Sequence, residues 1–163
     1  MILICYDDSA DSRAAVEQAA ALFAREEATV LTVWEPFIRV IEHAAFGLVP
    51  SLPDPEEIDE ASRKAADQAA AEGAALASRL GMSAVPRTAP QGITTARTIL
   101  SEAEAVEAST ILIGSRGRTG VTSLLLGSVS HEVIEHADRT VAVVPSPDVA
   151  TSRARAIREA AAT

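Results

Sequence analysis

The chain has 163 residues, a formal net charge of −9 and an aromatic content of only 3%. The negative charge argues against nucleic acid or an anionic membrane as a partner, and the shortage of aromatic side chains argues against stacking on single-stranded bases. No leader-like segment begins the chain and no apolar run is long enough to span a membrane, so we expect a cytoplasmic protein. The single cysteine, Cys5, lies in an apolar run and is expected to be a small core residue in a reduced compartment.

The first third of the chain predicts two strands separated by a helix. Residues 1–6 are a short apolar run followed by acidic residues, which is typical of a buried strand. Ser9 is the expected N-cap of an amphipathic helix that continues to about Glu27 and has Leu22 on its apolar face. The β-branched residues of 28–34 predict the second strand.

The middle of the chain predicts a long helix and an edge strand. The alanine-rich segment 58–80 favours a helix, with Asp54 as its N-cap and Gly81 as its stop. Residues 83–89 form a weaker strand, and Pro86 within it indicates a position at the edge of a sheet.

The last third of the chain predicts two further helices, each followed by a strand. A helix opens at Thr94 or Thr95, and residues 110–113 are the fourth strand. Residues 129–137 predict a fourth helix, and residues 140–144 the fifth strand. The inner face of that fourth helix is expected to carry Val129, Val133, Ile134 and Ala137.

Strands that alternate with helices predict an α/β domain with a parallel sheet and helices on both faces. We expect this domain to cover residues 1–145, with a helix-compatible C-terminal tail at 146–163. The long apolar connection at 35–53 is consistent either with a lid or interface or with a packed surface loop. In an open parallel sheet a ligand binds beyond the carboxyl ends of the strands, where the strand order reverses.

A glycine-punctuated loop follows the fourth strand and leads into a helix at residues 114–130. Glycines let backbone amides approach an anion closely, and the N-terminus of the helix adds positive potential. Gly117 and Gly120 are expected to adopt conformations that side chains disfavour, whereas Gly127 gives a phosphate close access to the backbone. The pattern therefore indicates phosphate binding; a tight turn without a ligand is the alternative.

Several side chains and amides of this loop could contact a phosphate. Ser128 is expected to be both N-cap and phosphate donor, and either Arg116 or Arg118 could offset the charge of a polyphosphate. Unpaired amides at the start of the helix belong to Ser128, Val129 and Ser130.

The familiar catalytic and metal-binding patterns are missing from the sequence. No glycine-rich loop ends in Gly-Lys-Ser or Gly-Lys-Thr, and no serine lies in a nucleophile-elbow motif. His131 and His136 are five residues apart, whereas helical metal ligands need a spacing of three or four. We therefore expect no catalytic residues and no metal site.

Over residues 1 to about 145 the chain resembles the universal stress protein (UspA-like) family. The strongest likeness is the spacing of Gly114, Gly117, Gly127 and Ser128, which resembles the motif of the family's ATP-binding members. The first strand with its acidic loop, and the second strand, are also similar to those of the family.

The resemblance implies a five-stranded parallel sheet of order 3-2-1-4-5 with the adenine nucleotide alpha hydrolase-like fold. It also implies ATP, alone or with Mg²⁺, as a bound ligand with little or no hydrolysis, and a homodimer that pairs through Val141–Val144. Adenine is expected near Asp7 and Val33. The expected nucleotide-binding residues are Tyr6, Asp7, Asp8, Val33, Gly114, Ser115, Arg116, Gly117, Gly120, Gly127, Ser128, Val129 and Ser130.

Asp8 departs from the family, which usually has glycine at this position. Its carboxylate either repels phosphate in the crevice or acts as an acid at the N-terminus of the first helix. Tyr6 could contact a base or be a core residue at the end of its strand. Two alternative functions follow: a nucleotide-free dimeric interaction module, and an adenylyl-transfer enzyme, for which the first loop lacks the expected serines and glycines.

Overall fold

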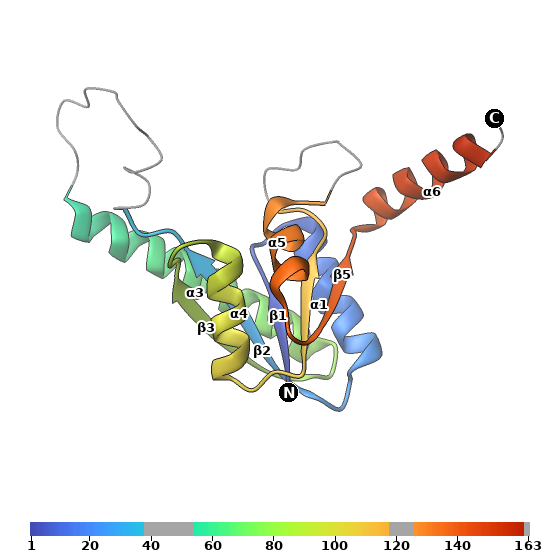
Figure 1. The fold of residues 1–163 in the computed structure, drawn as a ribbon. Coiled ribbons are helices and arrows are strands. Elements are labelled where there is room, and N and C mark those ends of the chain that lie inside the picture. The colour runs from blue at the N-terminus through green and yellow to red at the C-terminus, as the bar shows by residue number, and fades with distance from the viewer. Residues whose placement is uncertain (38–53, 118–125, 162–163) are drawn as a thin grey trace, which may run out of the picture.

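The computed structural model of the protein describes residues 1–37, 54–117 and 126–161, and it shows one sheet flanked by helices (Figure 1). The predictions for Gly120, for Arg118 and for most of the 35–53 connection therefore lie outside the described residues. The elements are β1 (Ile2–Cys5), α1 (Ala10–Leu22), β2 (Glu27–Trp34), α3 (Pro55–Arg79), β3 (Ser83–Pro90), α4 (Thr95–Ala105), β4 (Thr110–Gly114), α5 (Ser128–His136), β5 (Thr140–Val144) and α6 (Pro147–Ala161).

The sheet has five parallel strands in the order β3-β2-β1-β4-β5, which confirms the predicted architecture. The central strand β1 pairs with β2 through Ile2 and Ala28, and with β4 through Ile2 and Thr110. β3 is an edge strand, as Pro86 predicted. The order reverses between β1 and β4, so the loops that follow these two strands lie at the same edge of the sheet.

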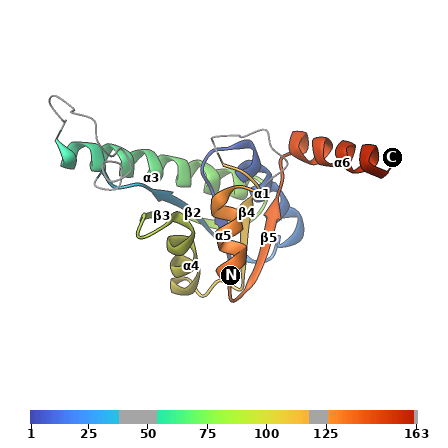
Figure 2. The ribbon, with the colours of Figure 1, turned by 45° about the horizontal axis from the view of Figure 1, so that its top comes forward.

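Alternate side chains of β1 point to opposite faces of the sheet, and each face has its own core. Ile2 and Ile4 pack with α1 and α3 on one face, whereas Leu3 and Cys5 pack with α4 and α5 on the other. Figure 2 shows these two pairs of helices on opposite sides of the sheet. The buried position predicted for Cys5 is confirmed, and burial followed by the charge of Asp7 raises the pKa of its thiol to about 12.

Three details of the helices differ from the prediction. Ser9 caps α1, accepting a hydrogen bond from the Ser12 backbone N–H, but the helix ends at Leu22 because β2 already begins at Glu27 and a turn must fit between them. Leu22 is 66% exposed, so it is not part of the apolar face. Ile134 is 47% exposed, because Ser130 and Val133 are the residues of α5 that turn inward.

The C-terminal tail, which the sequence indicated to be helix-compatible, forms the helix α6. It leaves the end of β5 and extends away from the sheet (Figures 1 and 2). Across the described ranges, none of the helices combines the length and the apolar character that a bilayer span requires.

Gly73 lets α3 pack closely against the sheet. A Cβ atom at this position would lie 2.8 Å from Cγ of Tyr6 and 2.9 Å from Cγ1 of Val30. Both distances are too short for carbon atoms in contact, so the absence of a side chain allows the helix to approach β1 and β2.

Asp11 joins α1 to the two chain segments that follow β4 and β5. The residue is 4% exposed, and its Oδ2 accepts hydrogen bonds from Ser115 Oγ at 2.7 Å and from the Arg116 backbone N–H at 3.0 Å. Ser146, just after β5, also donates to this carboxylate. Gly114 makes room for the contact, since a Cβ there would lie 2.9 Å from the Asp11 backbone.

The charge of Asp11 is favoured in the folded protein. Burial by itself would raise the pKa of this carboxyl, but hydrogen bonds from Ser146 and Ser115 and the charge of Arg116 together hold the pKa below its ordinary value of 3.8. Ionised Asp11 therefore stabilises the fold above pH 3.8, the ordinary pKa of the group. This contribution is lost as the pH falls through the lower pKa of the folded state.

Gly73→Ala should destabilise the protein by about 1 kcal/mol, because overpacking the α3 interface costs more than the gain in helix propensity. Denaturant unfolding measures this difference. Gly92→Ala is the matched control, since its Cβ would meet only Thr98 Oγ1 at 3.6 Å. Equal stability of Gly73→Ala and the wild type would show that α3 does not pack this closely.

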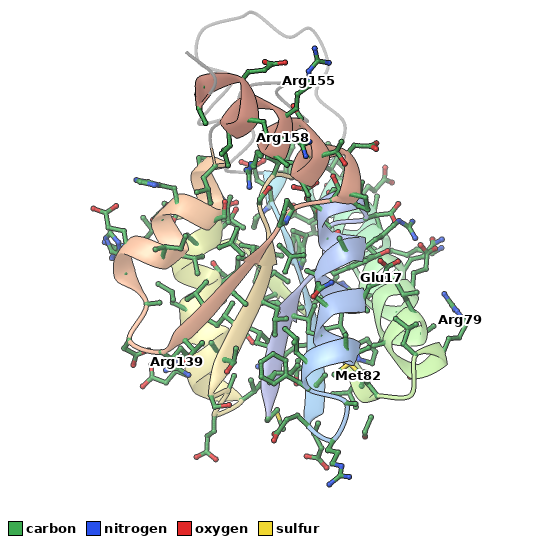
Figure 3. The ribbon with its side chains drawn as sticks, turned by 90° about the vertical axis from the view of Figure 1, so that its right-hand side faces the viewer. Glu17, Arg79, Met82, Arg139, Arg155 and Arg158 are labelled. Carbon is green, nitrogen blue, oxygen red and sulfur yellow. The ribbon has the colours of Figure 1, made fainter. Side chains whose placement is uncertain are left out.

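Asp11→Asn should lower the free energy of unfolding by about 2 kcal/mol or more at neutral pH, because the amide cannot accept all the donors that face the carboxylate. The difference from the wild type should shrink as the pH falls below 3.8. Glu17→Gln removes the same charge from an exposed position on α1 (Figure 3) and should stay within about 0.5 kcal/mol of the wild type. A pH-independent difference for Asp11→Asn would contradict the account.

Candidate functional site

A cavity of about 210 Å³ lies beyond the carboxyl ends of β1, β2 and β4, where the sheet order reverses. Its walls come from the three strand ends, from the N-terminal turns of α1, α4 and α5, and from the loop after β4. The lining residues are Cys5, Tyr6, Asp7, Ser12, Leu31, Val33, Thr95, Ile99, Ile113, Gly114, Arg116, Gly117, Gly127, Ser128, Val129 and Ser130.

Most of the predicted nucleotide-binding residues come together around this cavity. Those that line it are Tyr6, Asp7, Val33, Gly114, Arg116, Gly117, Gly127, Ser128, Val129 and Ser130. Ser115 is fully buried and lies behind the wall rather than in it. Asp8 is also outside the lining.

The polar end of the cavity is the N-terminus of α5. Gly127 rather than Ser128 is the N-cap, and no side chain caps the helix, so the prediction that Ser128 is the N-cap was wrong. Ser128 is instead the first helical residue, and its exposed side chain lines the cavity. The first intrahelical bond runs from the His131 N–H to the Gly127 carbonyl at 2.9 Å. The amides of residues 128–130 precede it and point out of the helix end.

Ser130 and Ser115 hold the start of α5 against the end of β4. The Ser115 carbonyl accepts hydrogen bonds from the Gly127 N–H at 2.8 Å and from Ser130 Oγ at 3.2 Å. Because of these two bonds, the position of the α5 N-terminus depends directly on the position of Ser115.

Gly117 and Asp7 are neighbours in the cavity wall. A Cβ at Gly117 would lie 2.9 Å from Asp7 Oδ2, while Asp7 Oδ1 accepts hydrogen bonds from the Ser9 N–H at 3.1 Å and Ser9 Oγ at 2.6 Å. The backbone of Gly117 has no positive φ. The reason predicted for this glycine was therefore wrong: it provides space beside Asp7, not an unusual conformation.

Asp8 adopts a left-handed backbone conformation, with φ of 65°. Glycine favours this region, which is a physical reason for the glycine usually present here in the family that the chain resembles. The Asp8 carboxylate pairs with Arg13 of α1 and accepts a hydrogen bond from the Tyr6 hydroxyl at 3.1 Å. The carboxylate is thus directed to α1 and away from the cavity lining.

Tyr6 is a core residue at the end of β1, with 3% of its surface exposed. Burial, followed by its hydrogen bond to Asp8, raises the pKa of the phenol to about 12. Its ring packs towards α3, and the residue also forms part of the cavity wall.

The opposite wall of the cavity is apolar, and the sequence interpretation did not include its residues in the site. Leu31 and Ile113 project from β2 and β4, and Ile99 lies one turn after Thr95 on α4. Strand alternation and the spacing of four residues on α4 could have identified them. An apolar wall beside Asp7 suits a flat heterocyclic ring, whereas the α5 amides and Arg116 suit an anion.

The two histidines that the sequence analysis set aside as metal ligands lie outside the site. His131 and His136 are exposed on α5 and do not line the cavity. Among the residues that the structure describes, no group of three histidine, cysteine, aspartate or glutamate side chains could hold a metal ion.

Comparison with known proteins identifies a family that covers most of the chain. Residues 1–145 match the model of the universal stress protein family. The universal stress protein Slr1101 of a Synechocystis strain is 53% identical over 38 residues, which span 23% of this chain and 35% of that protein.

Solved structures share the fold at low sequence identity. The universal stress protein UspA of Lactobacillus plantarum has a TM-score of 0.68 at 22% identity, over 88% of this chain and 95% of that one. A family protein of Arabidopsis thaliana with AMP bound has a TM-score of 0.59 at 14% identity, over 88% and 90% of the two chains. These neighbours have the adenine nucleotide alpha hydrolase-like fold. With the family match covering residues 1–145, the chain belongs to the universal stress protein family.

Proposed function

We propose that this protein binds an adenine nucleotide, ATP, in the cavity beyond β1, β2 and β4, and acts as a nucleotide-responsive regulator in a stress response. The observation that carries the proposal is the open N-terminus of α5, which lies beside Arg116 in a cavity whose other wall is apolar. Amides at a helix N-terminus and a guanidinium recognise phosphate, and the apolar wall accommodates a base.

Each part of the nucleotide has a matching part of the cavity. The base fits between Val33, Ile99 and Ile113, with the Asp7 carboxylate available to an exocyclic amine. The phosphates fit at Gly127 and the amides of 128–130, where the helix N-terminus opens to the cavity. AMP bound to the Arabidopsis relative supports adenine as the base.

The bound nucleotide should act as a ligand and not as a substrate. Lys64 is the only lysine of the chain, and it is exposed on α3, an element that contributes nothing to the cavity lining. A phosphate-binding lysine of the kind used in P-loop NTPases is therefore missing. We propose little or no hydrolysis, so ATP would stabilise the folded state by mass action.

Two variants of Ser128 test the binding mode. Ser128→Glu places a negative charge at the start of α5, which stabilises the helix itself but repels phosphate. ATP affinity measured by equilibrium dialysis, with and without Mg²⁺, should fall about tenfold or more. Ser128→Gln is the neutral control of similar size and should retain most of the affinity.

The wild-type result decides between the proposed function and its alternative. Uptake of ATP at millimolar concentration by the folded wild type supports the proposal. No uptake would contradict it and would favour a nucleotide-free dimeric interaction module. Equal affinity of Ser128→Glu and Ser128→Gln would show that ATP binds elsewhere on the molecule.

We also propose a cytoplasmic homodimer that pairs through β5, the edge strand opposite β3. An exposed apolar strand edge favours pairing with another chain. The Val144 carbonyl accepts a hydrogen bond from the Ser115 N–H and so faces β4. Because N–H groups alternate along a strand, the Val143 N–H points to the free edge of the sheet.

Val143→Pro should convert the dimer into a monomer, because proline removes the N–H that a second strand would use. Light scattering after size-exclusion chromatography should give twice the chain mass of 17.0 kDa for the wild type and the single mass for this variant. Val143→Thr keeps the N–H and should remain dimeric. A dimeric Val143→Pro variant would rule out pairing through this edge.

A further inference from the structure

The C-terminal helix α6 contacts the rest of the protein through one narrow face. Val149 is buried, and Arg153 and Ala156, one and two turns later, are half-buried. The remainder of the helix extends away from the sheet (Figures 1 and 2). Few contacts hold this helix in place, so each polar contact on its buried face has a large share in its docking.

Arg153 connects α6 to the residue behind the cavity wall. Its Nη2 donates a hydrogen bond to Ser115 Oγ at 3.2 Å, and the same hydroxyl donates to Asp11 Oδ2 at 2.7 Å. The Ser115 hydroxyl thus lies between a cation of α6 and the buried carboxylate of α1.

Ser115 also determines the position of the phosphate end of the cavity. Its carbonyl accepts the Gly127 N–H at 2.8 Å, and Gly127 is the N-cap of α5. The next residue, Arg116, lines the cavity and donates its backbone N–H to Asp11 at 3.0 Å. A restraint on Ser115 from α6 is therefore a restraint on Gly127, Arg116 and the α5 amides.

We propose that Arg153 is a positioning residue for the nucleotide site, and that cavity occupancy and docking of α6 stabilise each other. This inference rests on the proposed nucleotide binding. A phosphate that binds the α5 amides and Arg116 restrains the position of Ser115. Once Ser115 is restrained, its hydroxyl holds Arg153 more firmly. Linkage requires the reverse effect to be equal, so a docked α6 must raise nucleotide affinity by the same factor.

Two arginines on α6 allow the specific contact with Ser115 to be distinguished from a general effect of positive charge. Arg155 is on the exposed side of the helix, where it pairs with Glu159 at 2.7 Å (Figure 3). Arg153→Gln and Arg155→Gln remove the same charge from the same helix, but only the first removes the contact with Ser115. Arg153→Lys retains the charge and restores part of the contact.

The test measures affinity and helix docking in the same set of full-length proteins. ATP affinity by equilibrium dialysis should fall about fivefold or more in Arg153→Gln, remain unchanged in Arg155→Gln and recover in part in Arg153→Lys. Hydrogen–deuterium exchange of the α6 peptides should slow when ATP is added to the wild type and to Arg155→Gln, but not in Arg153→Gln. Thermal unfolding checks that every variant is folded.

Three results would overturn the inference. If the wild type binds no ATP, the proposed function and this coupling are both contradicted. A wild type that binds ATP, combined with equal affinities for Arg153→Gln and Arg155→Gln, leaves the proposed function intact and contradicts the coupling alone. Exchange in α6 that does not respond to ATP in the wild type contradicts it as well.

Discussion

The arrangement of the C-terminal half of the molecule depends on the hydrogen bonds that the Asp11 carboxylate accepts. It is buried in the first turn of α1, yet its hydrogen-bond donors are Ser115 and Arg116 after β4 and Ser146 after β5. Three segments far apart in the chain therefore meet at one charged group. Such a group is stable only when fully paired, so it specifies one arrangement of these segments.

The cavity follows from that arrangement. Asp11 holds Ser115 through the Ser115 hydroxyl, and the Ser115 carbonyl holds Gly127 through the Gly127 N–H. Gly127 is the N-cap of α5, so the first amides of this helix are directed at the space beyond β1. The outcome is an open helix N-terminus beside an apolar wall, with no lysine among the lining residues. Such an arrangement suits the proposed role of holding a nucleotide in one orientation.

Sequence patterns predicted the alternation of elements, and the family resemblance implied the strand order that the sheet has. The errors arose where tertiary contacts decide: α1 stops at Leu22, Ile134 faces outward, and Gly127 caps α5. Asp11 was not recognised as important, because an acid in the first turn of a helix is usually exposed. Its role depends on residues more than 100 positions away, and local sequence carries no signal of that contact.

The central claim is that an adenine nucleotide binds at the carboxyl ends of β1, β2 and β4. Titration of ¹⁵N-labelled protein with ATP, followed by NMR, locates the binding site residue by residue. We predict the largest shift changes at the amides of Gly117, Gly127 and Ser128, with little change on the exposed side of α3. Saturable shifts confined to another surface, or none at millimolar ATP, would contradict the account.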